Sequence, residues 1–186
     1  MKNACWIFSL VFSIVLLLAP AARGQNNQQG TATDPFLSKA IEMNQAEIDL
    51  GRMAQGKAQD PKVKQYAEMM VQDHTQALQK LRNAAGTSEG SVQLTKQHQQ
   101  TSDRLSKLTG TQFDKAYMDA MVRDHRVAVQ TFQSEAGTGS SANTSRQKPG
   151  ANGANDAEIA RELLPTLQKH LSQAEQVDRS VGGTAK

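Results

Sequence analysis

An internal repeat limits most strongly what this chain can fold into. Residues 66–74 match residues 117–125 at a constant offset, and each copy has a tyrosine, a methionine four residues later and a histidine four residues after that. This spacing places all three side chains on one face of an α-helix. The residues are Tyr66, Met70 and His74 in the first copy and Tyr117, Met121 and His125 in the second. We therefore predict two related helices, each with a histidine in its apolar stripe.

Start and stop signals bound the two repeat helices and predict three further helices around them. Asp34-Pro35 and Asp60-Pro61 each give a cap residue followed by proline at the first helical position, which predicts helices over about 35–57 and 61–85. A weaker segment, 92–108, is rich in glutamine and should lie on the surface with His98. The second repeat helix should end near 136. The last helix should begin near Asp156, with a kink or break before Pro165.

The remaining segments carry few apolar side chains or resemble a targeting sequence. Residues 1–24 have one early positive charge, a short apolar run and small residues before Gln25, as in a secretory signal peptide cleaved after Gly24. We expect a disordered leader at 25–33, a disordered loop at 137–155 and a flexible tail at 181–186. A single helical-bundle domain would then occupy 34–180. No alternating strand pattern occurs, so the fold class is all-α.

Charge and cysteine content exclude several kinds of partner and site. Lys2 and Arg23 lie in the predicted signal, so the 21 basic residues become 19, against 18 acidic ones. A nearly neutral chain without a basic run lacks the electrostatic footprint of a nucleic-acid-binding protein. No transmembrane segment is expected after cleavage. The only cysteine, Cys5, also lies in the signal, so the mature chain has no disulfide.

The candidate site residues are the histidines in apolar stripes and their neighbours. His170 occupies such a stripe in the last helix, alongside His74 and His125. Three core histidines could ligate a metal, or each could bond to a neighbouring helix; the pattern alone favours the structural role. Met70 and Met121 would suit copper, although methionine is also a common core filler. Glu47 is the best acidic candidate near the core. Asp73 and Asp124 point about 100° away from the histidines that follow them, so we expect them to be solvated or paired with Lys or Arg.

Several short motifs occur together in a fixed order and spacing: Phe36-Leu37 with Glu47 to Gly51, Met70 to His74, Leu108 to Asp114 followed by Asp124-His125, and Leu164 to Leu171. These motifs resemble the domain of unknown function 4142 family, whose members are often labelled "putative outer membrane protein" and grouped with ferritin-like bundles. The resemblance covers nearly all of the mature chain. It implies a ferritin-like up-and-down four-helix bundle with an extra short helix, in the periplasm or associated with the outer membrane. It implies no known activity.

One departure weakens the functional side of this analogy. Ferritin-like di-iron proteins carry Glu three residues before a ligand histidine, but this chain has Val71, Val122 and Leu167 at those positions. No nucleophile elbow, phosphate loop or dinucleotide fingerprint is present, so we do not expect an enzyme. The sequence favours a non-catalytic structural or stress-associated envelope protein. The alternative is a metal-binding or metal-buffering protein that uses copper, iron or zinc, and either could form a homo-oligomer or bind another envelope protein.

Overall fold

The computed structural model describes residues 34–87, 90–138 and 153–182, and within these ranges every regular element is a helix. The five helices are α1 (Pro35–Lys57), α2 (Pro61–Ala85), α3 (Lys96–Ser106), α4 (Gly110–Thr138) and α5 (Gly153–Ser180). The predicted all-α bundle of four long helices and one short helix is confirmed. No helix in the described part of the chain is both long and apolar enough to cross a membrane.

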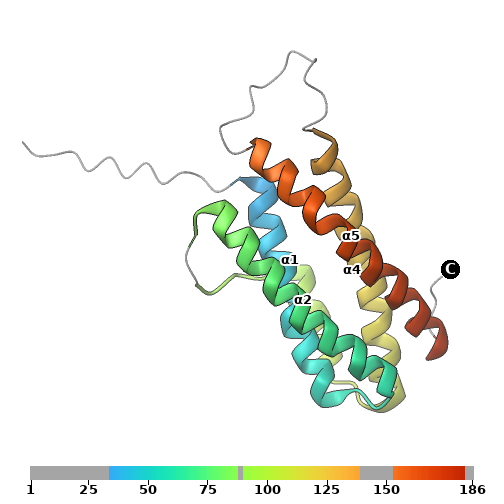
Figure 1. The fold of residues 1–186 in the computed structure, drawn as a ribbon. Coiled ribbons are helices and arrows are strands. Elements are labelled where there is room, and N and C mark those ends of the chain that lie inside the picture. Colours follow the sequence, from blue (N-terminus) through green and yellow to red (C-terminus); the bar gives the residue numbers. More distant parts are fainter. Residues whose placement is uncertain (1–33, 88–89, 139–152, 183–186) are drawn as a thin grey trace, which may run out of the picture. The chain divides into compact units, whose positions relative to one another are not determined.

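The two Asp-Pro pairs begin the first two helices as the sequence predicts. The side chain of Asp34 accepts a hydrogen bond from the backbone N–H of Phe36, and Asp60 does the same for Lys62. Each cap satisfies one of the N–H groups that a helix start leaves without an intrahelical partner. The connection between α1 and α2 is only three residues long, so the two helices are antiparallel neighbours (Figure 1).

Other helix boundaries differ from those predicted. The third segment forms a helix only from Lys96, where Thr95 caps it. The predicted loop at 137–155 is shorter at both ends, because α4 includes Gly137 and α5 begins at Gly153; residues 139–152 lie outside the described ranges. Of the kink or break predicted before Pro165, the break does not occur. Pro165 is exposed, so water can donate a hydrogen bond to the backbone carbonyl that is left without a partner because proline has no N–H, and α5 continues through it.

The four long helices pack as two antiparallel pairs, α1 with α2 and α4 with α5 (Figure 1). The pairs meet where α2 contacts α5 and where α1 contacts α4, and α3 lies against α1 and α4. The starts of α2 and α4 share one apolar cluster, so these two helices run in the same direction. The segment between them must therefore return along the bundle. This crossover modifies the expected up-and-down order, and a single long crossover is typical of ferritin-like connectivity.

Two apolar clusters form the core at different heights in the bundle. The lower cluster lies near the α1–α2 connection and contains Tyr66, Met70, Phe113, Tyr117 and Met121 among its buried side chains. The upper cluster contains Phe36, Leu37, Leu81, Phe132 and Ile159 among others. Close approach of α1 and α2 depends on Gly51, since a Cβ there would lie 2.9 Å from Val71 Cγ2. Buried polar side chains, among them His74, His125 and His170, lie between the two clusters.

Candidate metal centre

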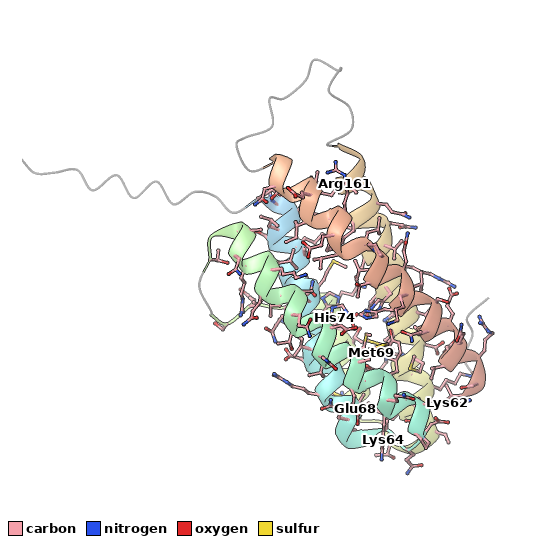
Figure 2. All side chains as sticks on the ribbon, in the orientation of Figure 1. Lys62, Lys64, Glu68, Met69, His74 and Arg161 are labelled. Atoms are coloured by element: carbon pink, nitrogen blue, oxygen red, sulfur yellow. The ribbon has the colours of Figure 1, made fainter. Side chains whose placement is uncertain are left out.

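The structure brings His74, His125 and His170 together from three different helices, α2, α4 and α5. Their exposed fractions are 4%, 1% and 1%. Their ring centroids are 5.3–5.5 Å apart, and one ring nitrogen of each lies within 4.8 Å of those of the other two. In Figure 2, His74 lies about midway along α2, above Lys62, Lys64 and Glu68. The prediction that all three histidines lie in the core is confirmed.

The three rings form a polar layer between the two apolar clusters. Along each helix, the histidine is preceded by a residue of one cluster and followed by a residue of the other. The flanking pairs are Met70 and Leu78 on α2, Val122 and Ala128 on α4, and Leu167 and Ala174 on α5. Because apolar side chains close the layer above and below, the ring nitrogens are shielded from water along the bundle axis.

Hydrogen bonds to Asn44 fix the orientation and tautomer of the His74 ring. The Nδ2 of Asn44 donates to the carbonyl oxygen of Ala40 one turn earlier, at 2.8 Å. The Oδ1 of Asn44 is then the atom that faces Nδ1 of His74, at 2.9 Å. An amide oxygen can only accept, so Nδ1 of His74 carries the proton. The Nε2 of this neutral ring consequently carries a lone pair.

The other two histidines are held in the same way by groups that can only accept. Nδ1 of His125 donates to the carbonyl oxygen of Met121 at 3.0 Å, which leaves the lone pair on Nε2. Nε2 of His170 donates to Oδ2 of Asp73 at 2.9 Å, which leaves the lone pair on Nδ1. This Nδ1 of His170 is buried and has no hydrogen-bond partner.

Three ring lone pairs are therefore available in one small, dry volume. Nε2 of His74 and Nε2 of His125 face each other at 3.4 Å, and two acceptor nitrogens at this distance repel unless an electron-pair acceptor lies between them. Two imidazole nitrogens bound tetrahedrally to one ion at about 2.0–2.1 Å would be about 3.3–3.4 Å apart. The arrangement could hold one metal ion. A carbonyl, amide or carboxylate on the far nitrogen of each ring is the usual support of a histidine ligand.

Burial keeps the three rings neutral, the form that binds metal. Desolvation lowers the pKa of His74 well below its ordinary value, and His125 and His170 lower it further. Desolvation likewise lowers the pKa of His125 to about 3. Burial also lowers the pKa of His170, although Asp73 partly opposes the effect. No ring has to release a proton at neutral pH before it binds an ion.

Two buried carboxylates lie on the α3 side of the histidine layer. Glu47 and Asp124 line a cavity of about 20 Å³ together with His74, His125 and His98. One oxygen of each carboxylate has no hydrogen-bond partner. Oε1 of Glu47 is 3.8 Å from Nδ1 of His125. Desolvation raises the pKa of Glu47 well above its ordinary value, and the negative charge of Asp124 raises it further.

The side chains on α3 show that this helix closes one side of the site. Nδ1 of His98 lies 2.7 Å from Oε1 of Glu42 on α1, and both side chains are about nine-tenths buried. The helix itself lies on the surface as predicted, but His98 is turned inward. Sequence reasoning missed this contact, because a glutamine-rich segment gives no sign of a buried partner on another helix.

The structure places the other predicted site residues as follows. Met70 and Met121 are fully buried in the lower cluster, and Met121 also supports His125 through its carbonyl oxygen. Their role as thioether ligands stays a prediction, as does that of Glu47. The expectation for Asp73 holds in part: its side chain is 31% exposed, but its partner is His170 on α5 and not a Lys or Arg. Asp124 pairs with Arg123 as expected, at 3.4 Å, but it is buried and not solvated.

Comparisons with known proteins assign a family and a fold. Residues 18–177 match the family described as "Domain of unknown function (DUF4142)". No curated protein matches the chain. A crystal structure described as "putative secreted protein DUF305 from Streptomyces coelicolor" has a similar fold, with a TM-score of 0.60 and 13% sequence identity. The similarity covers 81% of this chain and 92% of the other.

Proposed function

Because this chain belongs to the DUF4142 family, whose description assigns no activity, we propose a function from the site itself: the protein binds one transition-metal ion in the bundle core. The ligands are Nε2 of His74, Nε2 of His125 and Nδ1 of His170. One observation carries the proposal. In each ring an acceptor-only group holds the proton on one nitrogen, and one ring nitrogen of each histidine lies within 4.8 Å of those of the other two. The sequence pattern alone favours a structural role, and this convergence of lone pairs changes our preference.

The chemistry of the three ligands narrows the choice of ion. Neutral imidazole suits zinc, copper and iron better than magnesium or calcium, which prefer oxygen ligands. Three neutral rings do not balance the charge of a divalent ion, and a buried uncompensated charge is costly. Glu47 and Asp124, on the α3 side of the layer, can supply that compensation. The proposed activity is therefore binding or buffering of a divalent ion such as Zn²⁺, Cu²⁺ or Fe²⁺, without a catalytic step.

Two observations support an exported location for this activity. The first 24 residues have the composition of a cleaved secretory signal, and a protein of similar fold is described as secreted. We propose that the mature protein holds its ion outside the cytoplasm, in the periplasm or at the outer membrane. A metal analysis of protein purified without a histidine tag from an envelope fraction should then find the ion.

A thermal-unfolding titration tests the proposed function. An ion that binds only the native state stabilises it by RT ln(1 + [L]/Kd), which is about 2.7 kcal/mol at one hundred times Kd. The melting temperature of chelator-treated protein should therefore rise with the logarithm of free Zn²⁺, Cu²⁺ or Fe²⁺ above Kd, while the bound metal saturates at one equivalent. The His74→Ala, His125→Ala double variant should lose this rise.

The control must remove a histidine that is not one of the three proposed ligands. His98→Gln is the matched change, because His98 is the one histidine of the chain outside the ligand set. This variant should keep the concentration-dependent rise. If wild-type protein shows no concentration-dependent rise with any of the three ions, or if the double variant keeps it, the proposed function is wrong and the histidines are structural.

A further inference from the structure

Packing around the histidine layer differs from side to side in the described part of the bundle. The apolar clusters close it above and below, and α3 closes the α1–α4 side through His98 and Glu42. Between α1 and α2 the backbones approach so closely that Gly51 has no room for a Cβ. The α4–α5 pair also has an extensive interface. The α2–α5 side is the remaining candidate for a short path to solvent.

A small cavity occupies this remaining side. It has a volume of about 20 Å³, and its polar lining residues are Asn44, Asp73, His74, Thr166 and His170, together with apolar side chains. Thr166 is exposed, and 31% of the Asp73 side chain is exposed, whereas both histidines are buried. A cavity needs about 10–15 Å³ to hold a water molecule, so this one has room for a single small species. It connects partly exposed polar groups with two of the three proposed ligands.

We propose that the metal ion reaches the histidines through the α2–α5 side, and that the carboxylate of Asp73 receives it first. This inference rests on the proposed function. Asp73 is suited to the task because its partly exposed negative charge attracts a cation at the cavity. Its Oδ2 already contacts Nε2 of His170, so an ion held by the carboxylate is one side chain away from the site. Asp73 thus both orients His170 and captures the ion.

The repeat offers an internal comparison for this assignment. Asp124 is the counterpart of Asp73 in the second copy, but only 5% of its side chain is exposed and it pairs with Arg123. The two equivalent aspartates thus have different environments. Asp73 lines the partly exposed cavity, whereas Asp124 is enclosed beneath α3. The difference arises because α5 leaves the Asp73 side partly open, whereas α3 covers the Asp124 side.

Removing the charge of Asp73 should slow capture of the ion. Asp73→Asn keeps an acceptor oxygen for His170 and removes only the negative charge. The attraction of one carboxylate for a divalent ion near a protein surface corresponds to a change of about three- to tenfold in association rate at low ionic strength. Salt screens this attraction. The wild-type rate should therefore fall with added salt, and the rate of the variant should fall less.

The experiment is a stopped-flow measurement of Zn²⁺ association with the full-length mature protein, with Zn²⁺ release followed in a separate chelator chase. Asp73→Asn is compared with wild type and with Glu68→Gln, which removes an exposed carboxylate from the same helix. The expected result is a three- to tenfold slower association for Asp73→Asn and an unchanged rate for Glu68→Gln. If Asp73 only positions His170, release accelerates while association stays unchanged, and the capture role is wrong.

A second variant tests the opposite route. Glu42→Gln weakens the contact that holds α3 over the α1–α4 side. Its association and release rates should equal those of wild type if the ion passes between α2 and α5. Faster exchange in Glu42→Gln would overturn the proposed route. Failure of wild-type protein to bind Zn²⁺ or any other ion would overturn the function as well, so the two failures are distinguishable.

Discussion

The burial of His125 predicts how the stability of the metal-free protein depends on pH. Its pKa is lowered from 6.5 to about 3, chiefly by desolvation. The unfolded chain therefore binds a proton on this ring below pH 6.5, whereas the native state does not. The contribution of His125 to stability is fully present above pH 6.5 and is lost progressively as the pH falls toward 3. His74 and His170 act in the same direction.

The size of the effect follows from the two pKa values. At pH 7 the unfolded ring is mostly neutral, and at pH 5 it is almost fully protonated. The linkage integral between these limits gives a loss of about 2 kcal/mol for His125 alone. Buried carboxyl groups with a raised pKa oppose this loss. The native state binds their protons at a higher pH than the unfolded chain does, so a falling pH stabilises the native state. Glu47 behaves in this way, as does Asp156, whose pKa is raised to about 6 by burial and by Asp34 and Glu135.

Comparison of variants separates the contribution of His125 to the pH dependence of stability from that of these carboxyl groups. The free energy of unfolding is measured by urea denaturation, followed by circular dichroism, at pH 7 and pH 5 with a chelator present. The change between the two pH values should be about 2 kcal/mol smaller in His125→Gln than in wild type, because glutamine does not titrate. His98→Gln is the control for loss of a histidine outside the cluster. Equal pH dependence in wild type and His125→Gln would refute the claim that this ring is buried and neutral in the native state.

The remaining predictions test the fold, the ring tautomers and the processing. Gly51→Ala should destabilise the protein by about 1–3 kcal/mol in urea denaturation, because its Cβ would meet Val71, whereas Gly56→Ala, with nothing within 4 Å, should stabilise it by about 0.5–1 kcal/mol. Asp114→Ala should cost about 2–3 kcal/mol, since its carboxylate accepts the N–H groups of the α1–α2 connection. Nitrogen NMR of the metal-free protein should find the ring proton on Nδ1 in His74 and His125 and on Nε2 in His170. Intact mass should show cleavage after Gly24, and the exported chain should lack tryptophan fluorescence.

Helical periodicity was sufficient to predict most of the fold. It placed His74, His125 and His170 in apolar stripes, because the identity of a buried face depends only on spacing within one helix. The Asp-Pro pairs predicted the starts of α1 and α2 for the same local reason. The sequence predicts a kink or a break before Pro165, but the helix does not break there, because the propensity of proline does not account for the exposure of this residue to water.

The orientation of the histidine rings could not be predicted from periodicity. It depends on partners supplied by other helices, such as Asn44 on α1 for His74 and Asp73 on α2 for His170. Which helices are neighbours depends in turn on the crossover between α2 and α4, and local sequence signals do not define that path. The sequence could therefore show three core histidines but not that their lone pairs converge.

The central claim is that one ion binds at the point where these lone pairs meet. Anomalous X-ray scattering from crystals of the mature protein saturated with Zn²⁺ tests this claim most directly. We predict a single strong peak at about 2.0–2.1 Å from Nε2 of His74, Nε2 of His125 and Nδ1 of His170. A peak at surface carboxylates only, or no peak among the three histidines at saturating Zn²⁺, would contradict it.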